Sequence, residues 1–435
     1  MEKPLRLGVA GLGVVGTSLI QLLQRRRAEF VARAGRECVL TAYSARRKHD
    51  ATAGLGQVQF FENAAAMAAA ADIDVFVELI GGADGAAFEA VKAALARGLP
   101  VVTANKAMLA AHGLRLANLS ESHNAPLYYE AAVGGGIPVV KTLRESLAGN
   151  TIQRVAGILN GTCNYILSRM ETEKLTFDVC LAEAQRLGYA EADPTFDIGG
   201  FDTAHKLAIL ASLAFGSKID AAAVSVEGIE SITLADLAAA DELGFRIKLL
   251  GVAERTPHGI EQRVHPTMVS KSAPLAQTMG VLNAVSIDGD AVGELTLVGP
   301  GAGGDATASA VASDIADIAR GTRLPTFGRP AATLVDADRV PMQRHEGGYY
   351  VRLAVADRPG AMGAIAARFG ERMISLEAIM QKRAAKEAAA SGVVPVVLMT
   401  HGTTEASIRD ALAHAVEDGV VREKPQVIRI EREAF

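Results

Sequence analysis

The sequence predicts an α/β protein in three parts: an open parallel sheet, a mixed α+β region and a separate βαββαβ tail. A short apolar strand at residues 5–10 runs directly into a glycine-rich turn and then into a helix. Strand-like and helix-like runs alternate up to about residue 130, and a polar, proline-containing stretch at residues 321–344 precedes the tail. A chain of 435 residues is too long for one core, so two to three domains are expected.

The composition indicates a globular protein of the cytoplasm. A formal net charge of −5 argues against nucleic-acid binding by bulk electrostatics. No apolar run approaches a membrane span, and the first residues lead straight into a strand, so we expect neither a membrane segment nor a signal peptide. The cysteines lack metal-binding spacing, which is typical of a reducing compartment; they are Cys38, Cys163 and Cys180.

The glycine-rich turn has the GxGxxG pattern of a dinucleotide site. It consists of Gly11, Leu12, Gly13, Val14, Val15 and Gly16. Between a strand and a helix, these glycines permit a tight turn, close approach to a pyrophosphate and close helix packing. We therefore expect a Rossmann-type dinucleotide-binding domain; a glycine-rich turn without a ligand is the alternative.

The end of the next strand, at residues 38–43, bears on the choice of cofactor. It is followed by Arg46 and Arg47, without the acidic residue that usually binds an NAD ribose. Arginines suit a 2′-phosphate, so NADP(H) is favoured and NAD(H) is possible. A solvated basic turn is the alternative, and the long first crossover at residues 25–37 leaves the choice between the two arginines open.

Three further strands complete the first sheet, at residues 74–80, 100–103 and 127–130. Ligands of such sheets bind at the carboxyl ends of the strands, so Lys106 points toward the cofactor crevice. Glu130 precedes a glycine run. From the residues alone, this run favours a plain turn before a helix at residues 138–148 over a loop whose oxygens hold a hard cation.

After residue 150 the pattern becomes mixed. A second glycine-rich stretch at residues 299–304 opens a helix at 306–320 that could pack back on the first part. We assign residues 1–137 plus 301–322 to the dinucleotide-binding domain, 138–300 to a substrate-binding domain, 323–346 to a linker and 347–435 to the tail.

The stretch at residues 188–206 concentrates the candidate chemistry. Asp202 and Lys206 are four apart, so they share one helix face. The helix predicted at residues 201–213 is too apolar for a surface helix, which places Lys206 at the mouth of a buried element. An ordinary exposed ion pair is the alternative. With Glu191 and Asp197 close in sequence, the lysine suits amino-acid binding and proton transfer.

The tail is predicted to be βαββαβ, a form that is more often regulatory than catalytic. Residues 384–391 form a long connection between two of its strands. The elements are strands at residues 350–356, 374–381, 393–400 and 427–430 and helices at 361–369 and 405–417.

Together these motifs resemble homoserine dehydrogenases, in the monofunctional form with a C-terminal ACT domain. The resemblance covers nearly the whole chain and is carried by residues 11–16, 103–106, 130–138, 159–165, 188–206 and 301–305. It implies NAD(P)-dependent interconversion of L-aspartate 4-semialdehyde and L-homoserine, a step of threonine, methionine and isoleucine biosynthesis. No aspartate kinase domain precedes the first strand, so the bifunctional form is not expected.

The resemblance also implies residue roles. Lys206 is the proton donor and acceptor, Lys106 is a second active-site lysine, and Asp202 has a catalytic and substrate-binding role. Glu191 and Asp197 are expected to bind substrate, and Gly188 and Gly303 to bind cofactor. A sodium ion is implied at the Glu130 carboxylate and the carbonyls of Val133, Gly135 and Ile137, which reverses the simpler interpretation of that loop. Threonine feedback through the tail is implied, as is a homodimer through the middle domain, with tetramers possible.

The residues support a mechanism, and two alternatives remain. Reduction of an aldehyde develops negative charge on its oxygen, which a protonated lysine can neutralise. With acids close by, Lys206 is expected to keep its proton at neutral pH, so homoserine oxidation should improve in alkali. The alternatives are a different NAD(P)-dependent amino-acid dehydrogenase, which substrate profiling would separate, and a non-catalytic NADPH and amino-acid sensor, which would bind without turnover.

Overall fold

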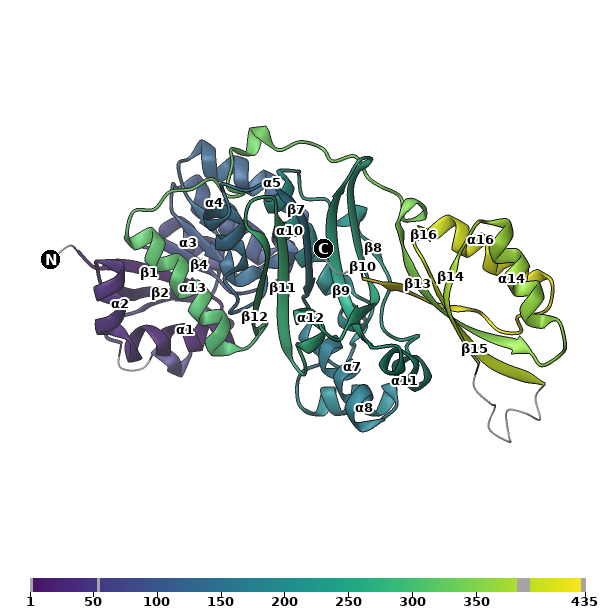
Figure 1. The fold of residues 1–435 in the computed structure, drawn as a ribbon. Helices are drawn as coiled ribbons and strands as arrows, with labels where there is room; N and C mark the ends of the chain where they lie inside the picture. The colour runs from purple at the N-terminus through teal and green to yellow at the C-terminus, as the bar shows by residue number, and fades with distance from the viewer. Residues whose placement is uncertain (1–2, 53–54, 382–391, 432–435) are drawn as a thin grey trace.

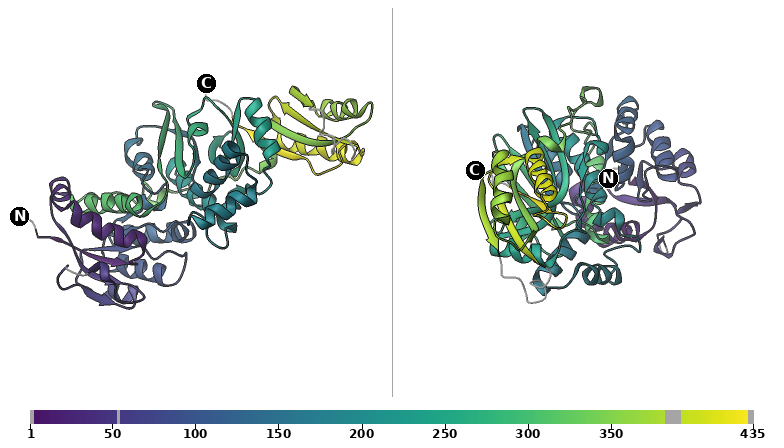
Figure 2. Two further views of the ribbon diagram at one scale, coloured as in Figure 1. Left: turned by 90° about the horizontal axis from the view of Figure 1, so that it is seen from below. Right: turned by 90° about the vertical axis from the view of Figure 1, so that its right-hand side faces the viewer.

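The computed structural model of the chain describes residues 3–52, 55–381 and 392–431. The molecule is elongated, with a first sheet at one end, a mixed region in the middle and a small α/β unit at the other end (Figure 1). The left-hand view of Figure 2 shows the same order of the three parts, and in the right-hand view the tail faces the viewer. No helix within the described ranges is long and apolar enough to cross a membrane.

The first sheet is parallel, and in the described residues its strand order is β3-β2-β1-β4-β5-β6. This is the order of a doubly wound dinucleotide-binding sheet, whose switch point lies between β1 and β4. Its strands are β1 (Leu5–Ala10), β2 (Cys38–Ser44), β3 (Gln59–Phe61), β4 (Val75–Glu78), β5 (Val101–Thr103) and β6 (Leu127–Tyr128). Its helices are α1 (Val14–Arg25), α2 (Arg27–Ala34), α3 (Ala64–Ala70), α4 (Ala86–Ala96) and α5 (Lys106–Ser122). The predicted α/β class and parallel sheet are confirmed.

A helix from much later in the chain completes this first unit. Helix α13 (Gly304–Ala319) lies beside α1 (Figure 1). A Cβ added at Gly304 would lie 2.4 Å from Ser18 Oγ, so the two helices meet closely at their starts. Val311 and Ile315 of α13 are fully buried in the same core as Leu19 of α1. The helix therefore does pack back on the first part of the chain.

The second sheet is mixed and runs from the middle region into the tail. Its order in the described residues is β12-β11-β7-β9-β10-β17-β13-β15-β14, with β8 and β16 paired at its sides. The middle region contributes β7 (Ile152–Ile158), β8 (Ser225–Val226), β9 (Phe245–Thr256), β10 (Gly259–Ser270), β11 (Leu282–Gly289) and β12 (Gly293–Pro300). Its helices are α7 (Gly161–Glu173), α8 (Phe177–Arg186), α9 (Thr195–Ile198), α10 (Phe201–Phe215), α11 (Leu234–Glu242) and α12 (Pro274–Gln277).

Helix α10 lies at the centre of the molecule. Its residues from Leu207 to Phe215 are all buried, and it contacts α5 of the first unit as well as β7 and β9. The apolar sequence after Lys206 is therefore core, as the sequence predicted.

The tail has the predicted βαββαβ order. Its elements are β13 (Glu346–Ala356), α14 (Ala361–Glu371), β14 (Leu376–Gln381), β15 (Val393–Thr400), β16 (Thr403–Thr404), α16 (Glu405–Glu417) and β17 (Gln426–Ile430). The strand order β17-β13-β15-β14 is antiparallel throughout and is that of a ferredoxin-like unit. Residues 384–391 lie outside the described residues.

The tail shares a β-sheet with the middle region instead of forming a separate unit with its own sheet. Strand β17 pairs in parallel with β10 at Thr267↔Arg429 and Met268↔Ile430. The proline-containing stretch before the tail is also packed, because Thr326 and Phe327 are buried and Tyr129 Oη donates to the Thr326 carbonyl at 2.9 Å.

One predicted helix differs from expectation. Instead of a helix at residues 138–148, the chain forms α6 (Val139–Lys141) and then a π-helical turn (Thr142–Ser146). The wide turn places Arg144 inside the protein, where its guanidinium lies 4.8 Å from the centre of the Tyr128 ring.

Some elements of the structure were not predicted from the sequence. Among them are helices α2, α3, α5 and α11 and strand β3.

Candidate active site

The glycine turn after β1 forms the floor of a cleft at the carboxyl ends of the first sheet. Gly11 has φ +99°, and a Cβ there would lie 2.5 Å from the Leu79 carbonyl oxygen. A Cβ at Gly16 would lie 2.2 Å from the Gly11 carbonyl oxygen, whereas Gly13 has open space. The three glycines thus serve the turn, the helix packing and close access to the backbone, as a pyrophosphate site requires.

The cleft beside this turn has a volume of about 670 Å³. Both predicted arginines, Arg46 and Arg47, line it from the loop after β2. The sequence did not single out three further polar residues that line it: His49, Glu62 and Asn63. Asn63 caps α3 by accepting from the Ala66 amide at 2.9 Å, so its sequence signal was that of a helix cap.

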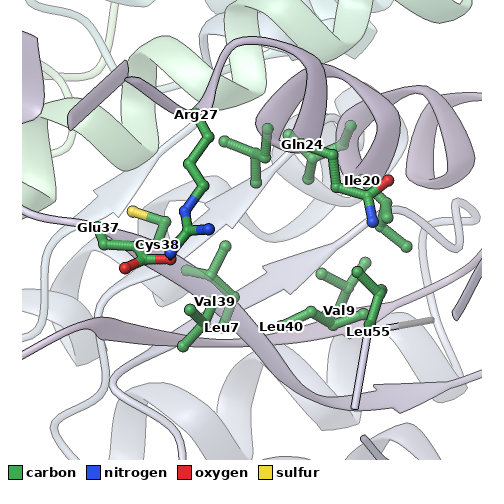
Figure 3. A pocket seen from close by; sticks show the side chains of 12 residues that line it. Leu7, Val9, Ile20, Gln24, Arg27, Glu37, Cys38, Val39, Leu40 and Leu55 are labelled. Carbon is green, nitrogen blue, oxygen red and sulfur yellow. The ribbon is translucent and has the colours of Figure 1, made fainter. Parts of the chain in front are cut away.

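A second cavity of about 320 Å³ lies between α1 and the first two strands (Figure 3). Its lining is mostly apolar, and Arg27 points toward Glu37, which it contacts at 2.6 Å. Burial raises the pKa of the Cys38 thiol in this lining to about 12, so the thiol is a poor nucleophile.

Two lysines meet on one buried carboxylate. Lys206 Nζ lies 2.6 Å from Asp202 Oδ2, and Lys106 Nζ lies 3.1 Å from Asp202 Oδ1. Lys106 is the first residue of α5 in the first unit, whereas Asp202 and Lys206 occupy successive turns of α10. The structure therefore brings together three predicted site residues from two parts of the molecule.

Asn160 and a carbonyl complete this cluster. The Asn160 amide nitrogen donates to Asp202 Oδ2 at 2.9 Å and to Asp197 Oδ1 at 2.8 Å. Lys206 Nζ also donates to the Leu159 carbonyl at 2.7 Å. No role in the site was predicted for Asn160. Its Oδ1 caps α7 by accepting from the Cys163 amide at 2.8 Å, while its amide nitrogen enters the site.

The pKa values of the two aspartates in the cluster are shifted in opposite directions. Burial raises the pKa of the Asp202 carboxyl, but Lys206 and Lys106 outweigh burial and hold this pKa well below its usual range. The pKa of Asp197 is raised, chiefly by burial and despite the hydrogen bond from Asn160. Asp202 is therefore a fixed negative charge between two ammonium groups. A cationic group of a ligand placed beside Asp197 would stabilise the charged form of its carboxylate.

The other predicted site residues lie outside this cluster. Glu191 and Gly188 are exposed on the turns between α8 and α9. The backbone carbonyl of Glu191 accepts from Gln185 Nε2 at 3.0 Å. Gly303 precedes α13, near the start of α1. His205, which precedes Lys206 in α10, packs its ring edge-on against Phe196, with 5.4 Å between the ring centres.

The loop predicted to hold a cation is buried in the protein, as the exposed fractions of Glu130, Val133 and Ile137 show. Glu130 accepts from the amides of Val140 and Lys141 at 2.9 and 2.8 Å, and its own amide donates to Asp314 Oδ2 at 2.8 Å. Burial raises the pKa of Glu130 to about 7 and that of Asp314 to about 6. The carbonyl of Ile137 accepts from the Val139 amide at 2.8 Å. No group of three or more His, Cys, Asp or Glu in the described residues could hold a metal, so a cation here would depend on carbonyl oxygens.

Comparison with known proteins identifies the family. The model of the homoserine dehydrogenase NAD-binding domain matches residues 11–130, and that of homoserine dehydrogenase matches residues 138–316. A homoserine dehydrogenase of Pseudomonas aeruginosa is 44% identical over 420 residues, covering 94% of this chain and 95% of that protein.

Solved structures agree. A homoserine dehydrogenase of Thiobacillus denitrificans is 41% identical with a TM-score of 0.91, covering 99% of this chain and 98% of that chain. A hyperthermophilic archaeal homoserine dehydrogenase in complex with NADPH is 28% identical with a TM-score of 0.62, covering 72% of this chain and 97% of that chain. On these matches and on the fold and cluster described above, the chain belongs to the homoserine dehydrogenase family, a family of NAD(P)-dependent oxidoreductases.

Proposed function

We propose that this chain catalyses the reversible NAD(P)H-dependent reduction of L-aspartate 4-semialdehyde to L-homoserine at the cluster around Asp202. The observation that carries the proposal is the contact of one buried carboxylate with Lys106 and Lys206. The two lysines belong to the unit with the dinucleotide cleft and to the middle region, so a reaction between cofactor and substrate would occur where these parts meet. The homoserine dehydrogenase names of the relatives supply the substrates.

Lys206 is assigned as the proton donor and acceptor. A dinucleotide held by residues 11–16 would supply the hydride. The Lys206 ammonium donates its proton to the oxygen that becomes the hydroxyl of homoserine, and the lysine takes a proton back in the oxidation direction. Asp202 and the Leu159 carbonyl hold Nζ of Lys206 in place. Lys106 adds positive charge beside the developing alkoxide.

The amino-acid part of the substrate needs partners for its ammonium and carboxylate groups. Asp197 is assigned to the ammonium, because it lies beside Asp202 through Asn160 and lacks a cation of its own within hydrogen-bond distance in the described residues. Glu191 is assigned to the same substrate on its sequence motif, Glu191-Ala-Asp-Pro, since its carboxylate lies outside the cluster.

We propose NADP(H) as the preferred cofactor, with NAD(H) also accepted. The support is the placement of Arg46 and Arg47 on the cleft, where a 2′-phosphate would meet them. Gly11 to Gly16 would hold the pyrophosphate at the start of α1, and Gly303 would approach it from α13.

A sodium ion is proposed at Glu130 and the carbonyls of Val133, Gly135 and Ile137. The support is that burial, and then Asp314, raise the pKa of Glu130 despite the hydrogen bonds from Val140 and Lys141, so a nearby cation would stabilise the charged carboxylate. Oxygen ligands suit a hard ion.

The tail is proposed to be an ACT-type regulatory domain that responds to threonine. Its support is the βαββαβ unit, which follows the last residue matched by the family models, 316. We retain the domain limits 1–137 plus 301–322, 138–300, 323–346 and 347–435. We also propose a cytoplasmic homodimer or homotetramer, which light scattering on the purified protein would test.

Absorbance of the reduced nicotinamide tests the activity. With L-homoserine and NADP⁺, wild-type protein is expected to reduce the cofactor, and Lys206→Ala should lower kcat by roughly 10²–10⁴-fold, the usual effect of losing a proton-transfer group. Lys218→Ala, which removes an exposed lysine paired with Asp336, should keep wild-type turnover. Oxidation should speed up between about pH 7 and 9. Homoserine-dependent turnover that survives in Lys206→Ala, or a rate that falls across that pH range, would contradict the assignment.

A further inference from the structure

A short path of contacts leads from the tail to the helix that carries Asp202 and Lys206. It begins at Arg429 on β17, which is only 2% exposed and is bound by two carboxylates. Glu405 of the tail contacts Arg429 Nε and Nη2 at 3.1 and 2.8 Å. Glu227 of the middle region contacts Nη1 and Nη2 at 2.9 and 2.8 Å. Arg429 thus binds one carboxylate on each side of the junction.

Glu227 is followed by the segment that touches the active-site loop. A Cβ at Gly228 would lie 2.4 Å from the Ile198 carbonyl oxygen, so the two backbones are in direct contact. The amide of Ile229 donates to that carbonyl at 3.0 Å. Residues 227–229 therefore lie against the loop before α10, a segment that consists of the short helix α9 with Asp197 and the turn that follows it.

Backbone hydrogen bonds connect this loop with the start of α10, the helix that carries Asp202 and Lys206. The amide of Gly200 donates to the Asp197 carbonyl at 3.0 Å, and Ala204 donates to the Gly200 carbonyl at 3.0 Å. Asp202 stands in the first turn of α10 and Lys206 in the second. A shift of Ile198 would therefore move Asp197 and the start of α10 together.

We propose that Glu227 is a positioning residue: through its paired hydrogen bonds with Arg429, the C-terminal unit holds the loop before α10, and with it Asp202 and Lys206, in place for the reaction. This rests on the proposed function, because it takes these two residues as the reacting site. The path runs through the middle region and reaches the first unit only at its end, where Asp202 contacts Lys106. The tail is therefore expected to act on substrate handling rather than on the dinucleotide cleft, whose glycine turn and arginines the path does not touch.

The structure allows the link to be cut without detaching the tail. Arg429 would keep Glu405 as a partner if Glu227 lost its charge. A second junction also remains, in which Arg352 of β13 contacts Asp236 of α11 at 2.6 Å and Tyr350 Oη donates to Asp236 at 3.1 Å. Glu227 is partly exposed, so glutamine is accommodated there.

The test compares Glu227→Gln with a matched control, Glu371→Gln, which removes a carboxylate from a tail ion pair with Arg368 that lies away from this path. In the full-length enzyme, Glu227→Gln is expected to lower kcat/KM for homoserine about tenfold, since small misplacements of reacting groups are costly. The Kd for NADPH should stay within about twofold of wild type. Glu371→Gln should match wild type in both.

Two further variants address the same path. Arg429→Lys keeps the charge but cannot bind both carboxylates in the same way, so it should show the same selective loss. Gly228→Ala pushes on Ile198 directly and should do likewise. The proposal is overturned if Glu227→Gln and Glu371→Gln have equal kcat/KM for homoserine, if only Gly228→Ala is impaired, or if NADPH binding falls in parallel.

Lys206→Ala, assayed alongside, separates this proposal from the one on which it rests. Full turnover in Lys206→Ala would reject the proposed site itself. Loss of turnover in Lys206→Ala together with a normal Glu227→Gln enzyme would reject only the positioning role.

Discussion

At the scale of residues, the site depends on one carboxylate with two lysine partners. Asp202 is buried, yet its pKa is held low by Lys206 and Lys106 against the effect of burial. Two rules predicted parts of this arrangement: residues four apart share a helix face, which pairs Asp202 with Lys206, and a residue after a parallel strand points into the crevice, which applies to Lys106. Only the family resemblance implied that both lysines belong to one active site. Asn160 was missed as a site residue, because an asparagine before Gly-Thr already has a sufficient explanation as a helix cap.

The two arginines on the cleft give a test of cofactor choice. Arg46→Ala with Arg47→Ala should raise KM for NADP⁺ about tenfold or more, because a charge-assisted hydrogen bond contributes about 1.5–3 kcal/mol. KM for NAD⁺ should change less than about twofold on the same scale. Initial rates with each cofactor measure this, with Arg33→Ala on α2 as an exposed control. Equal losses with both cofactors would show that the arginines do not recognise a 2′-phosphate.

Lys248 gives a test of pH dependence. This lysine is 1% exposed and donates to Asn164 Oδ1 at 3.0 Å and to the Thr278 carbonyl at 2.7 Å. Burial lowers the pKa of its ammonium to about 8, whereas an unfolded chain holds the proton up to about pH 10.4. Between these pH values the folded state binds fewer protons than the unfolded state. The contribution of Lys248 to the free energy of unfolding therefore becomes less unfavourable as the pH rises.

Urea unfolding at several pH values measures this effect. The free energy of unfolding of wild type, minus that of Lys248→Met, should increase by up to about 3 kcal/mol from pH 8 to 10.4. A difference that stays constant over this range would show that Lys248 titrates normally in the folded protein.

At the scale of elements, loops were harder to predict than helices and strands. Residues 138–148 have the composition of a helix, but Glu130 binds the amides of Val140 and Lys141, and the turn widens to bury Arg144. These constraints come from residues on other segments, such as Asp314 on α13, so local sequence does not contain them.

The Glu130 loop gives the test at this scale. Replacing choline chloride by sodium chloride at constant ionic strength should raise the melting temperature of wild type, and sodium at a hundred times its Kd would add about 2.7 kcal/mol. Glu130→Gln should lose most of this gain, because the neutral side chain removes the charge that attracts the ion. Glu89→Gln, an exposed carboxylate on α4, should retain it. A gain of the same size in Glu130→Gln would place the sodium effect elsewhere.

At the scale of the whole molecule, the second sheet joins the middle region and the tail. The sequence predicted each part, including the order of elements in the tail. It did not predict the pairing of β10 with β17, because two strands far apart in the chain leave no local signal of being neighbours. The ionic contacts of Arg429 and Asp236 reinforce the same junction.

The continuous sheet predicts shared stability. In hydrogen exchange followed by mass spectrometry, amides of β10, β17 and β13 should lose protection together as urea is added, because they form one cooperative unit. Peptides of β2 and β3, in the other sheet, provide the internal comparison. Exchange of β13 and β17 well before β10 would show that the tail unfolds independently.

The return of α13 to α1 also has a consequence for synthesis of the chain on the ribosome. The core around Leu19 lacks Val311 and Ile315 until α13, which ends at Ala319, has been made. The last strand of the first sheet, β6, ends at Tyr128, and the 191 residues from there to Ala319 take roughly 10–40 seconds at 5–20 residues per second. During that time the nascent first sheet exposes an apolar face. Newly made chains should therefore depend on chaperones until α13 has left the ribosome.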